Sequence, residues 1–432
     1  MNSHLKTLRV GMLGCGVVGS EVARLLIDSP EDFAARSGAK LELAAVAVRD
    51  ISIKRPGIDP SILTTDAASI INDPKIDIII EVMGGIEPAR SLILQAFKNK
   101  KSVVTANKAL LAKHGAELYE TAAANGEDIY YEAAVAGAIP IIRPLRSSLV
   151  GDHIEKIMGI VNGTTNYILT KMDETGAAFG DALKEAQDLG FAEADPSADV
   201  DGFDAAAKAA ILAGLAFHTR VTDADVSREG ITEITSTDVA VAKSLGLVIK
   251  LLAIAELTPD DAISVRVHPT LLPRNHPLAS VREAFNAVFV EAEAAGSLMF
   301  YGRGAGGAPT ASAILGDVVA VARHVLSGGV GPSESIYADR DIAPVGAIET
   351  RYLIRLDVED RPGVLAAVAQ TFAKNNLSIQ TVRQTGSGNG AELIAMTHKA
   401  KDSELSATVK ALAELDIVKD VASVIRVEGF EQ

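Results

Sequence analysis

Carboxylates gather at the start of an alanine-rich segment, and a lysine follows them at helical spacing. The segment VDGFDAAAKAAILAG covers residues 200–214; Asp199, Asp201 and Asp204 lie at its start, and Lys208 follows Asp204 by four residues. On a helix these two side chains share a face, so Asp204 can hold the ammonium group of Lys208 in place for proton transfer. The same pattern also fits a capped helix with one surface salt bridge, which contributes only roughly 0.2–0.5 kcal/mol.

The acidic character extends into the preceding loop. The stretch GFAEADPSADVDG, together with Asp204 just after it, carries five acidic residues and no basic one. Carboxylates at this density repel one another unless a cation lies among them. Solvation by water, a metal ion or the ammonium group of a substrate would each relieve the repulsion.

A glycine-rich turn near the N-terminus has the spacing of a phosphate-binding loop. An apolar run from Leu8 to Leu13 precedes Gly14, Gly16 and Gly19, and an amphipathic segment follows. In a strand–turn–helix context, G-x-G-x-x-G predicts a dinucleotide site, with the pyrophosphate at the helix N-terminus. The alternative is a glycine-rich turn without a ligand.

The end of the second expected strand bears on the choice of cofactor. The strand LELAAVAV (residues 41–48) ends without the acidic residue that would bind a ribose 2′-hydroxyl; Arg49 follows it, and Asp50 comes next. Because an arginine here suits a 2′-phosphate, we favour NADP and leave NAD open. In the alternative, Arg49 is a surface residue paired with Asp50.

Further strands alternate with helical segments and predict a doubly wound parallel sheet. The expected strands are Ile76–Gly85, Ser102–Lys108 and Ile129–Gly137. Ligands bind at the carboxyl edge of such a sheet. The residues placed at that edge are Gly84, Gly85, Thr105, Asn107 and Lys108. Taken alone, Lys108 is more typical of a surface lysine than of a site lysine.

Composition excludes several classes of protein. The 432 residues suffice for two or three domains, and a formal charge of −15 argues against a nucleic-acid or anionic-membrane partner. The single cysteine, Cys15, forms no intramolecular disulfide and no multi-thiolate metal site. Without a signal-peptide pattern or a long apolar stretch, we expect a cytoplasmic protein with no membrane partner.

The C-terminal half shows two changes of pattern. We expect one helix over residues 236–257 and a strand near residues 262–273. Residues 328–350 are rich in glycine and proline, so we interpret them as a linker to a separable module. That module follows a β-α-β-β-α-β pattern, with strands near Tyr352–Val358, Ile379–Thr385, Ala391–Thr397 and Val421–Val427 and helices near Val364–Asn375 and Ser403–Leu415.

Several segments together resemble the homoserine dehydrogenase family. They occur in family order from Leu8 to about Arg323, and they read GCGVVG, VTANKALLA, YYEAAVAGAIPII, GIVNGTTNYIL, FAEADPSADVDGFDAAAKAAILA and GRGAGGAPTASAILGD. The resemblance implies the interconversion of L-homoserine and L-aspartate 4-semialdehyde with NADP or NAD. It also implies that Lys208 transfers the proton, with Lys108 and Asp204 as further catalytic residues.

The same resemblance assigns binding residues. Glu193, Asp199 and Thr164 would bind the substrate. The cofactor would contact Gly14, Gly16, Val17, Val18, Gly19, Arg49, Thr105, Lys108 and Gly306. A sodium ion would lie at Glu132, Val135, Gly137 and Ile139.

The C-terminal module, with DRPGVL at a strand–helix turn, resembles an ACT domain. The implied fold is α/β, with a doubly wound Rossmann domain, an α+β substrate and dimerisation domain and a βαββαβ ACT domain. We expect their bounds at 1–140, 141–327 (with 305–327 returning to the nucleotide domain) and 351–432, after the linker 328–350. ACT domains bind amino acids across paired modules, so the resemblance implies a threonine effector and a homodimer or homotetramer. A dimerisation module without ligand is the alternative.

Two other functions fit the same residues. One is reduction of another small amino-acid semialdehyde by the same apparatus. The other is a catalytically silent sensor of NADP and amino acids. The presence of Lys108, Glu193, Asp204 and Lys208 together argues against a silent protein.

Overall fold

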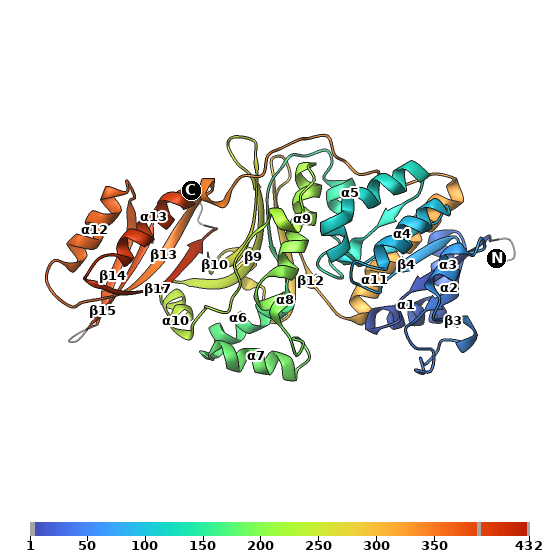
Figure 1. Cartoon of the computed structure of the whole chain (residues 1–432), viewed down its shortest axis with the longest axis horizontal. Coiled ribbons are helices and arrows are strands. Elements are labelled where there is room, and N and C mark those ends of the chain that lie inside the picture. The colour runs from blue at the N-terminus through green and yellow to red at the C-terminus, as the bar shows by residue number, and fades with distance from the viewer. Residues whose placement is uncertain (1–4, 387–389, 430–432) are drawn as a thin grey trace. The chain divides into compact units, whose positions relative to one another are not determined.

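The computed structural model describes residues 5–386 and 390–429 (Figure 1). The chain divides into two compact units. The first consists of Met1–Ile157, Ala207–Asp225 and Phe285–Asp339, and the second of Met158–Ala206, Val226–Ala284 and Arg340–Gln432.

A six-stranded parallel sheet forms the centre of the first unit. Its strand order is β3-β2-β1-β4-β5-β6, the order typical of dinucleotide-binding domains. The strands are β1 (Thr7–Leu13), β2 (Lys40–Ala47), β3 (Leu63–Thr64), β4 (Ile78–Glu81), β5 (Ser102–Thr105) and β6 (Ile129–Tyr130). The helices between them are α1 (Val17–Asp28), α2 (Pro30–Ser37), α3 (Ala67–Asn72), α4 (Ala89–Lys98) and α5 (Lys108–Asn125). The doubly wound fold is confirmed.

The last strand of this sheet is shorter than the sequence predicted. We expected a strand over Ile129–Gly137, but β6 ends at Tyr130, and a 3₁₀ turn, η2, covers Glu132–Ala134. Ala136 and Gly137 both have positive φ angles, of 56° and 57°, which a strand does not allow. The prediction was wrong beyond Tyr130 because the chain turns there.

A late helix completes the core of the first unit. Helix α11 (Gly307–Ser327) packs its buried face, including Ile314 and Val318, into the same cluster as Leu8 and Val22. It is long and apolar enough to span a membrane by length and composition alone. Its place in this core accounts for its hydropathy, as in the core helices of globular domains. The hairpin of β11 (Phe285–Ala292) and β12 (Gly296–Arg303) also belongs to this unit.

The second unit contains a mixed sheet. Its strands run in the order β7-β9-β10-β17-β13-β15-β14. They are β7 (Ile154–Ile160), β9 (Leu247–Leu257), β10 (Ile263–Pro273), β13 (Glu349–Val358), β14 (Ile379–Thr385), β15 (Ala391–Thr397) and β17 (Val418–Val427). The helices are α6 (Gly163–Thr175), α7 (Phe179–Asp188), α8 (Ser197–Val200), α10 (Ser236–Ser244), α12 (Val364–Lys374) and α13 (Asp402–Ala413). Helix α9 (Phe203–Phe217) begins in this unit and continues in the first.

We predicted one long helix over residues 236–257, and this prediction is wrong for the second half of the segment. Helix α10 ends at Ser244, Gly246 has a positive φ of 72°, and β9 begins at Leu247. Strand β9 pairs with β10 along its whole length and is buried on both faces from Leu247 to Ala255. A strand buried on both faces shows no alternation, so its sequence resembles that of a buried helix.

The C-terminal βαββαβ pattern is confirmed, and its strands join the sheet of the second unit. Strand β17 pairs in parallel with β10, so the C-terminal strands continue the sheet of the second unit. Arg266 on β10 is 1 % exposed, and its guanidinium lies 2.7 Å from Glu256 and 2.9 Å from Glu428. A buried arginine depends on such partners, so the C-terminal module and the rest of this unit stabilise each other.

Candidate active site

Each of the three glycines of the N-terminal loop occupies its position for a different structural reason. Gly14 has a φ of +100°, and a Cβ there would lie 2.7 Å from the carbonyl oxygen of Val82. A Cβ on Gly19 would lie 2.5 Å from the carbonyl oxygen of Gly14, so this glycine lets α1 approach β1 closely. Gly16 caps α1 and has open space around it. A phosphate group can therefore approach the backbone at Gly16 and the N-terminus of α1.

A second helix N-terminus lies beside this loop. Gly306, with a φ of +118°, is the N-cap of α11. A Cβ on the next residue, Gly307, would lie 3.1 Å from both the Val17 and the Glu21 side chains. The start of α11 thus packs against the first turn of α1. Gly306 was predicted as a cofactor residue from the sequence, whereas Gly307 was not, although the GRGAGG run contains both.

Arg49 is exposed directly after β2. The carboxylate of Asp50 accepts hydrogen bonds from the backbone N–H and the hydroxyl of Ser52, and these bonds lower the pKa of Asp50. Within residues 5–386 and 390–429, no ion pair joins Arg49 to Asp50. The alternative in which this pair occupies Arg49 is therefore not observed, and the guanidinium is accessible to a phosphate.

Lys108 is the first residue of α5, and a buried network fixes the start of this helix. Asn107 is the N-cap: its Oδ1 accepts the N–H of Leu110, and its Nδ2 donates to the carbonyl of Gly85 over 2.6 Å. The hydroxyl of Thr105 accepts the N–H of Asn107. Lys108 is thereby held at the carboxyl edge of the sheet, where the sequence placed it.

Glu81 is a buried carboxylate at the same edge, and it was not among the predicted site residues. One oxygen accepts the hydroxyl of Thr105 over 2.6 Å, and the other accepts the N–H groups of Met83 and Gly84. Glu81 and Thr105 are both fully buried. The Thr105 hydroxyl therefore serves to join β5 to β4, and a contact between Thr105 and the cofactor stays a prediction.

In the second unit, a buried asparagine joins two of the acidic residues. Asn162 caps α6 through the N–H of Thr165, and its Nδ2 donates to Asp199 over 2.6 Å and to Asp204 over 2.9 Å. Asp204 is buried and Asp199 half-buried. The geometry brings the two carboxylates together as the acidic pattern predicted. Asn162 was missed, although it stands in the quoted NGTTN motif.

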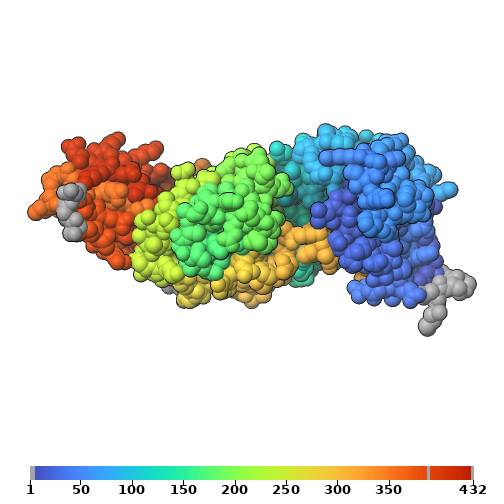
Figure 2. Space-filling view, turned by 90° about the horizontal axis from the view of Figure 1, so that it is seen from below, coloured from blue at the N-terminus to red at the C-terminus, as the bar shows by residue number. Residues whose placement is uncertain are grey.

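Two side chains anchor the start of the acidic loop. The hydroxyl of Thr164 donates to the carbonyl of Phe191 over 2.6 Å, and Gln187 donates to the carbonyl of Glu193. The carboxylate of Glu193 is exposed. The green segment that includes α6 and α7 lies open on the face shown in Figure 2. A solute can therefore reach Glu193 from water, whereas Asp204 is enclosed.

The N-terminus of α9 is fixed within the second unit. The guanidinium of Arg228 lies 3.4 Å from the ring centroid of Phe203 and donates to the carbonyl of Asp201. Further along the same helix, Lys208 is only 7 % exposed. The interpretation as a surface salt bridge is therefore wrong, since a lysine is seldom buried without a structural or chemical role.

The turn after β6 offers oxygen ligands. Both oxygens of the buried Glu132 carboxylate already accept backbone N–H groups, from Ile141, Ile142 and Arg143, at 2.7–2.9 Å. Burial raises the pKa of Glu132 above its ordinary value, and these hydrogen bonds offset only part of that rise. Among the described residues, no group of three or more His, Cys, Asp or Glu side chains could hold a metal. A cation here would rely on backbone carbonyl oxygens, which suit a hard ion such as sodium.

Comparisons with known proteins agree with this geometry. Three family models match the chain: the homoserine dehydrogenase NAD-binding domain over residues 14–132, homoserine dehydrogenase over 140–319, and the ACT domain over 352–416. The homoserine dehydrogenase of Corynebacterium glutamicum is 56 % identical over 423 residues, covering 97 % of this chain and 95 % of that protein. That of Mycobacterium tuberculosis strain H37Rv is 55 % identical over 434 residues, covering 98 % of each.

Solved structures show the same similarity. The crystal structure of a homoserine dehydrogenase from Thiobacillus denitrificans superposes with a TM-score of 0.94 at 41 % identity, covering 98 % of this chain and 99 % of that one. A hyperthermophilic archaeal homoserine dehydrogenase in complex with NADPH gives a TM-score of 0.63 at 27 % identity, covering 76 % of this chain and 99 % of that one. With a Rossmann sheet, a glycine loop of the required geometry and full-length relatives, the chain belongs to the homoserine dehydrogenase family of NAD(P)-dependent enzymes and carries a C-terminal ACT domain.

Proposed function

We propose that the chain interconverts L-homoserine and L-aspartate 4-semialdehyde with Lys208 as the proton-transferring group and NADP as the preferred cofactor. The observation that carries the assignment is that Lys208 is buried one helical turn after the buried Asp204 on α9. Asp204 in turn shares the Asn162 amide with Asp199, and we call Glu193, Asp199 and Asp204 the acidic cluster. The direct test is homoserine-dependent formation of the reduced nicotinamide, followed by its absorbance. Activity with another amino-acid alcohol but not with homoserine would contradict the substrate assignment.

Proton transfer follows from the residues of α9. Oxidation of an alcohol removes a hydride from carbon and a proton from oxygen, and the nicotinamide, when bound, accepts the hydride. A neutral Lys208 accepts the proton in this direction, and its ammonium form returns it to the developing alkoxide in reduction. Asp204 favours the ammonium form and orients it. Lys108, fixed at the start of α5, contributes a second positive charge at the reacting oxygen.

The negative charge of the acidic cluster suits a substrate that carries an ammonium group, as an amino acid does. Glu193 and Asp199 would bind the α-ammonium group, and Thr164 fixes the loop two residues before Glu193. Charged hydrogen bonds of this kind are roughly twice as strong as neutral ones. Asn162 keeps Asp199 and Asp204 close together despite their like charges.

Replacing Glu193 with glutamine is expected to raise the KM for homoserine about tenfold or more, because a neutral amide no longer attracts the substrate ammonium. The KM for the cofactor should change little. Initial-rate kinetics with each substrate varied in turn measure both constants. The matched control is Asp195→Asn, since Asp195 is an exposed neighbour whose carboxylate accepts hydrogen bonds from Ser197 in its own turn. Equal changes in both KM values would exclude Glu193 as a substrate ligand.

Arg49→Ala is expected to weaken NADP binding by about 1–3 kcal/mol and to leave NAD binding nearly unchanged, because only NADP carries a 2′-phosphate. The exposed guanidinium after β2 supports this assignment, and so does the NADPH complex of the archaeal relative. Fluorescence titration of both reduced cofactors measures the effect. If both affinities fall together, Arg49 has a structural role; a wild type that prefers NAD would refute the NADP assignment.

A sodium ion at the turn after β6 is a further part of the proposal. The carbonyl oxygens of Val135, Gly137 and Ile139, together with Glu132, would hold it, and its charge would stabilise this buried turn. Support comes from the oxygen-only donor set and from the positive φ angles of Ala136 and Gly137, a conformation seldom kept without a reason.

The ACT domain would respond to an amino acid, with threonine as the proposed effector, in a cytoplasmic homodimer or homotetramer. We expect threonine to inhibit homoserine oxidation by the full chain, through a coupling of roughly 5- to 150-fold between the two sites. Activity assays over a threonine series, with calorimetry for binding, test this. If neither threonine nor any other amino acid affects the rate, the domain serves assembly only.

A further inference from the structure

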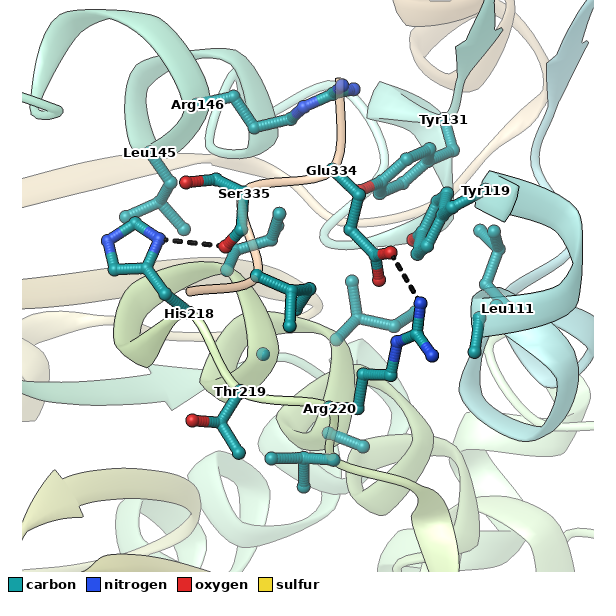
Figure 3. Close-up of a pocket in the computed structure, with 18 of the residues that line it drawn as sticks. Leu111, Tyr119, Tyr131, Leu145, Arg146, His218, Thr219, Arg220, Glu334 and Ser335 are labelled. Atoms are coloured by element: carbon teal, nitrogen blue, oxygen red, sulfur yellow. Dashed lines mark hydrogen bonds and ion pairs between the residues drawn. The ribbon is translucent and has the colours of Figure 1, made fainter. Parts of the chain in front are cut away.

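A cavity lies entirely within the first unit. It has a volume of about 530 Å³ and is lined by α5, by α9 and the residues after it, by residues 145–150 and by residues 332–337 (Figure 3). This volume is ordinary for a small-molecule site. None of the residues assigned above to substrate, cofactor or sodium lines it. It is therefore a different site from the one that binds homoserine.

The cavity combines an apolar body with positive charge. Its apolar lining includes Leu111, Leu145, Ile211, Leu215 and Val221, with the rings of Tyr119 and Tyr131 on one side. Its charged lining contains three cations, Lys113, Arg146 and Arg220, and one carboxylate, Glu334. Arg146 lies 5.5 Å from the ring centroid of Tyr131 and forms no ion pair with a carboxylate of the described residues. Lys113 lies 3.8 Å from Asp223, which does not line the cavity. Arg146 and Arg220 are therefore the cations that favour an anion apart from Glu334.

Glu334 enters the cavity from a segment that crosses it. Its Oε2 accepts a hydrogen bond from Arg220 over 3.1 Å, and the carboxylate is seen pointing at Arg220 in Figure 3. The side chain of Glu334 is 18 % exposed, whereas Glu120, which also pairs with Arg220, is 64 % exposed and does not line the cavity. Glu334 is thus the enclosed partner of Arg220.

The segment that carries Glu334 is fastened at both ends. Arg146 donates to the carbonyl of Pro332, and Nδ1 of His218 lies 3.1 Å from the carbonyl oxygen of Ser335. The ring of Tyr337 stacks on His218 at 4.4 Å between centroids. These contacts hold residues 332–337 across the opening, so the Glu334 carboxylate occupies the place of a bound ligand.

We propose that this cavity is a binding site for a small organic carboxylate with an apolar body, and that Glu334 is its intramolecular occupant. The ligand carboxylate pairs with Arg220 in place of Glu334, and its apolar part packs on Ile211, Leu215 and Leu145. Such a ligand contacts α5 three residues after Lys108 and α9 three residues after Lys208. The proposal stands independently of the roles assigned to those two lysines.

The test uses the full chain and calorimetric titration with 3-phenylpropionate, which carries one carboxylate on an apolar body, and with its neutral analogue 3-phenylpropanamide. Glu334→Gln should bind the acid roughly threefold to tenfold more tightly than wild type, because the competing carboxylate is gone. Asp32→Asn is the matched control, since Asp32 forms an exposed ion pair with Arg36 elsewhere in the first unit. It should leave the affinity unchanged.

Adding Arg220→Gln to Glu334→Gln should remove the gain for the acid and should leave the affinity for the amide as it was. Binding should persist at saturating homoserine, which separates this cavity from the substrate site. Thermal unfolding of each variant establishes that it is folded, and the neutral Arg220→Met serves if the glutamine variant is not. Equal affinities for acid and amide in Glu334→Gln, no saturable binding, or displacement by homoserine would each overturn the proposal.

Discussion

Lys208→Ala is expected to lower the turnover of homoserine by about 100-fold or more, the scale of losing a general acid–base group. The loss should appear in kcat more than in the KM for either substrate, because the ammonium acts on the oxygen that gains charge in the transition state. Cofactor affinity should hardly change, since the residues proposed for the pyrophosphate are the glycine loop and the N-terminus of α1. Steady-state kinetics in both directions provide the measurement.

The control is Lys184→Ala, which removes an exposed lysine that pairs with Asp188 at the same four-residue spacing on α7. This control should leave turnover unchanged. Comparing the two variants therefore distinguishes the loss of the proton-transferring group from the general effect of removing a positive charge. Lys208→Arg keeps the positive charge, but a guanidinium does not give up its proton at working pH. The turnover of this variant should therefore stay as low as that of Lys208→Ala. A folded Lys208→Ala enzyme with turnover close to that of wild type would refute the assignment.

Glu428→Ala is expected to lower the free energy of unfolding by about 2–4 kcal/mol, because it leaves Arg266 buried with one carboxylate fewer. Arg266 keeps Glu256 and the Ser264 hydroxyl as partners, so the loss should stay below that of a fully uncompensated charge. The pair also joins β10 to the residue that follows β17, so the apparent melting temperature of the catalytic part should fall with that of the C-terminal module.

Glu359→Ala is the matched control, since Glu359 forms an ion pair with Arg361 in which both side chains are exposed. Exposed pairs of this kind contribute about 0–1 kcal/mol. Thermal unfolding followed by circular dichroism, with activity loss as a second readout, compares the two variants. Equal shifts in both, or two separate transitions in wild type, would show that the C-terminal module is thermodynamically independent after all.

The acidic cluster and the glycine loop could be predicted because both are local in sequence. Gly14, Gly16 and Gly19 lie within six residues of one another, and their strand–turn–helix context is visible in the adjoining apolar pattern. The C-terminal strands and helices were placed within a few residues, since each alternates or repeats in its own short window. The resemblance to a known family then supplied roles that spacing alone left open.

Long-range contacts decided the rest. The segment 247–257 looked helical because burial on both faces erases the alternation of a strand, and only its pairing with β10 makes it β9. The residues around 328–350 were interpreted as a linker to a separate module. However, β10 pairs with β17, which lies about 150 residues later in the chain, and Arg266 on β10 forms a buried ion pair with Glu428 just after β17.

By itself, the sequence determined the fold class and the family, because residue type and local period carry that information, and it predicted which residues do the chemistry. The tertiary structure decided that Lys208 is enclosed, that Asn162 joins two carboxylates, and that Glu81 and Thr105 fix the start of α5. It alone revealed the cavity around Glu334, whose walls come from α5, Tyr131, residues 145–150, α9 with the residues after it, and residues 332–337. Burial and side-chain pairing depend on which segments meet, and no local pattern records that.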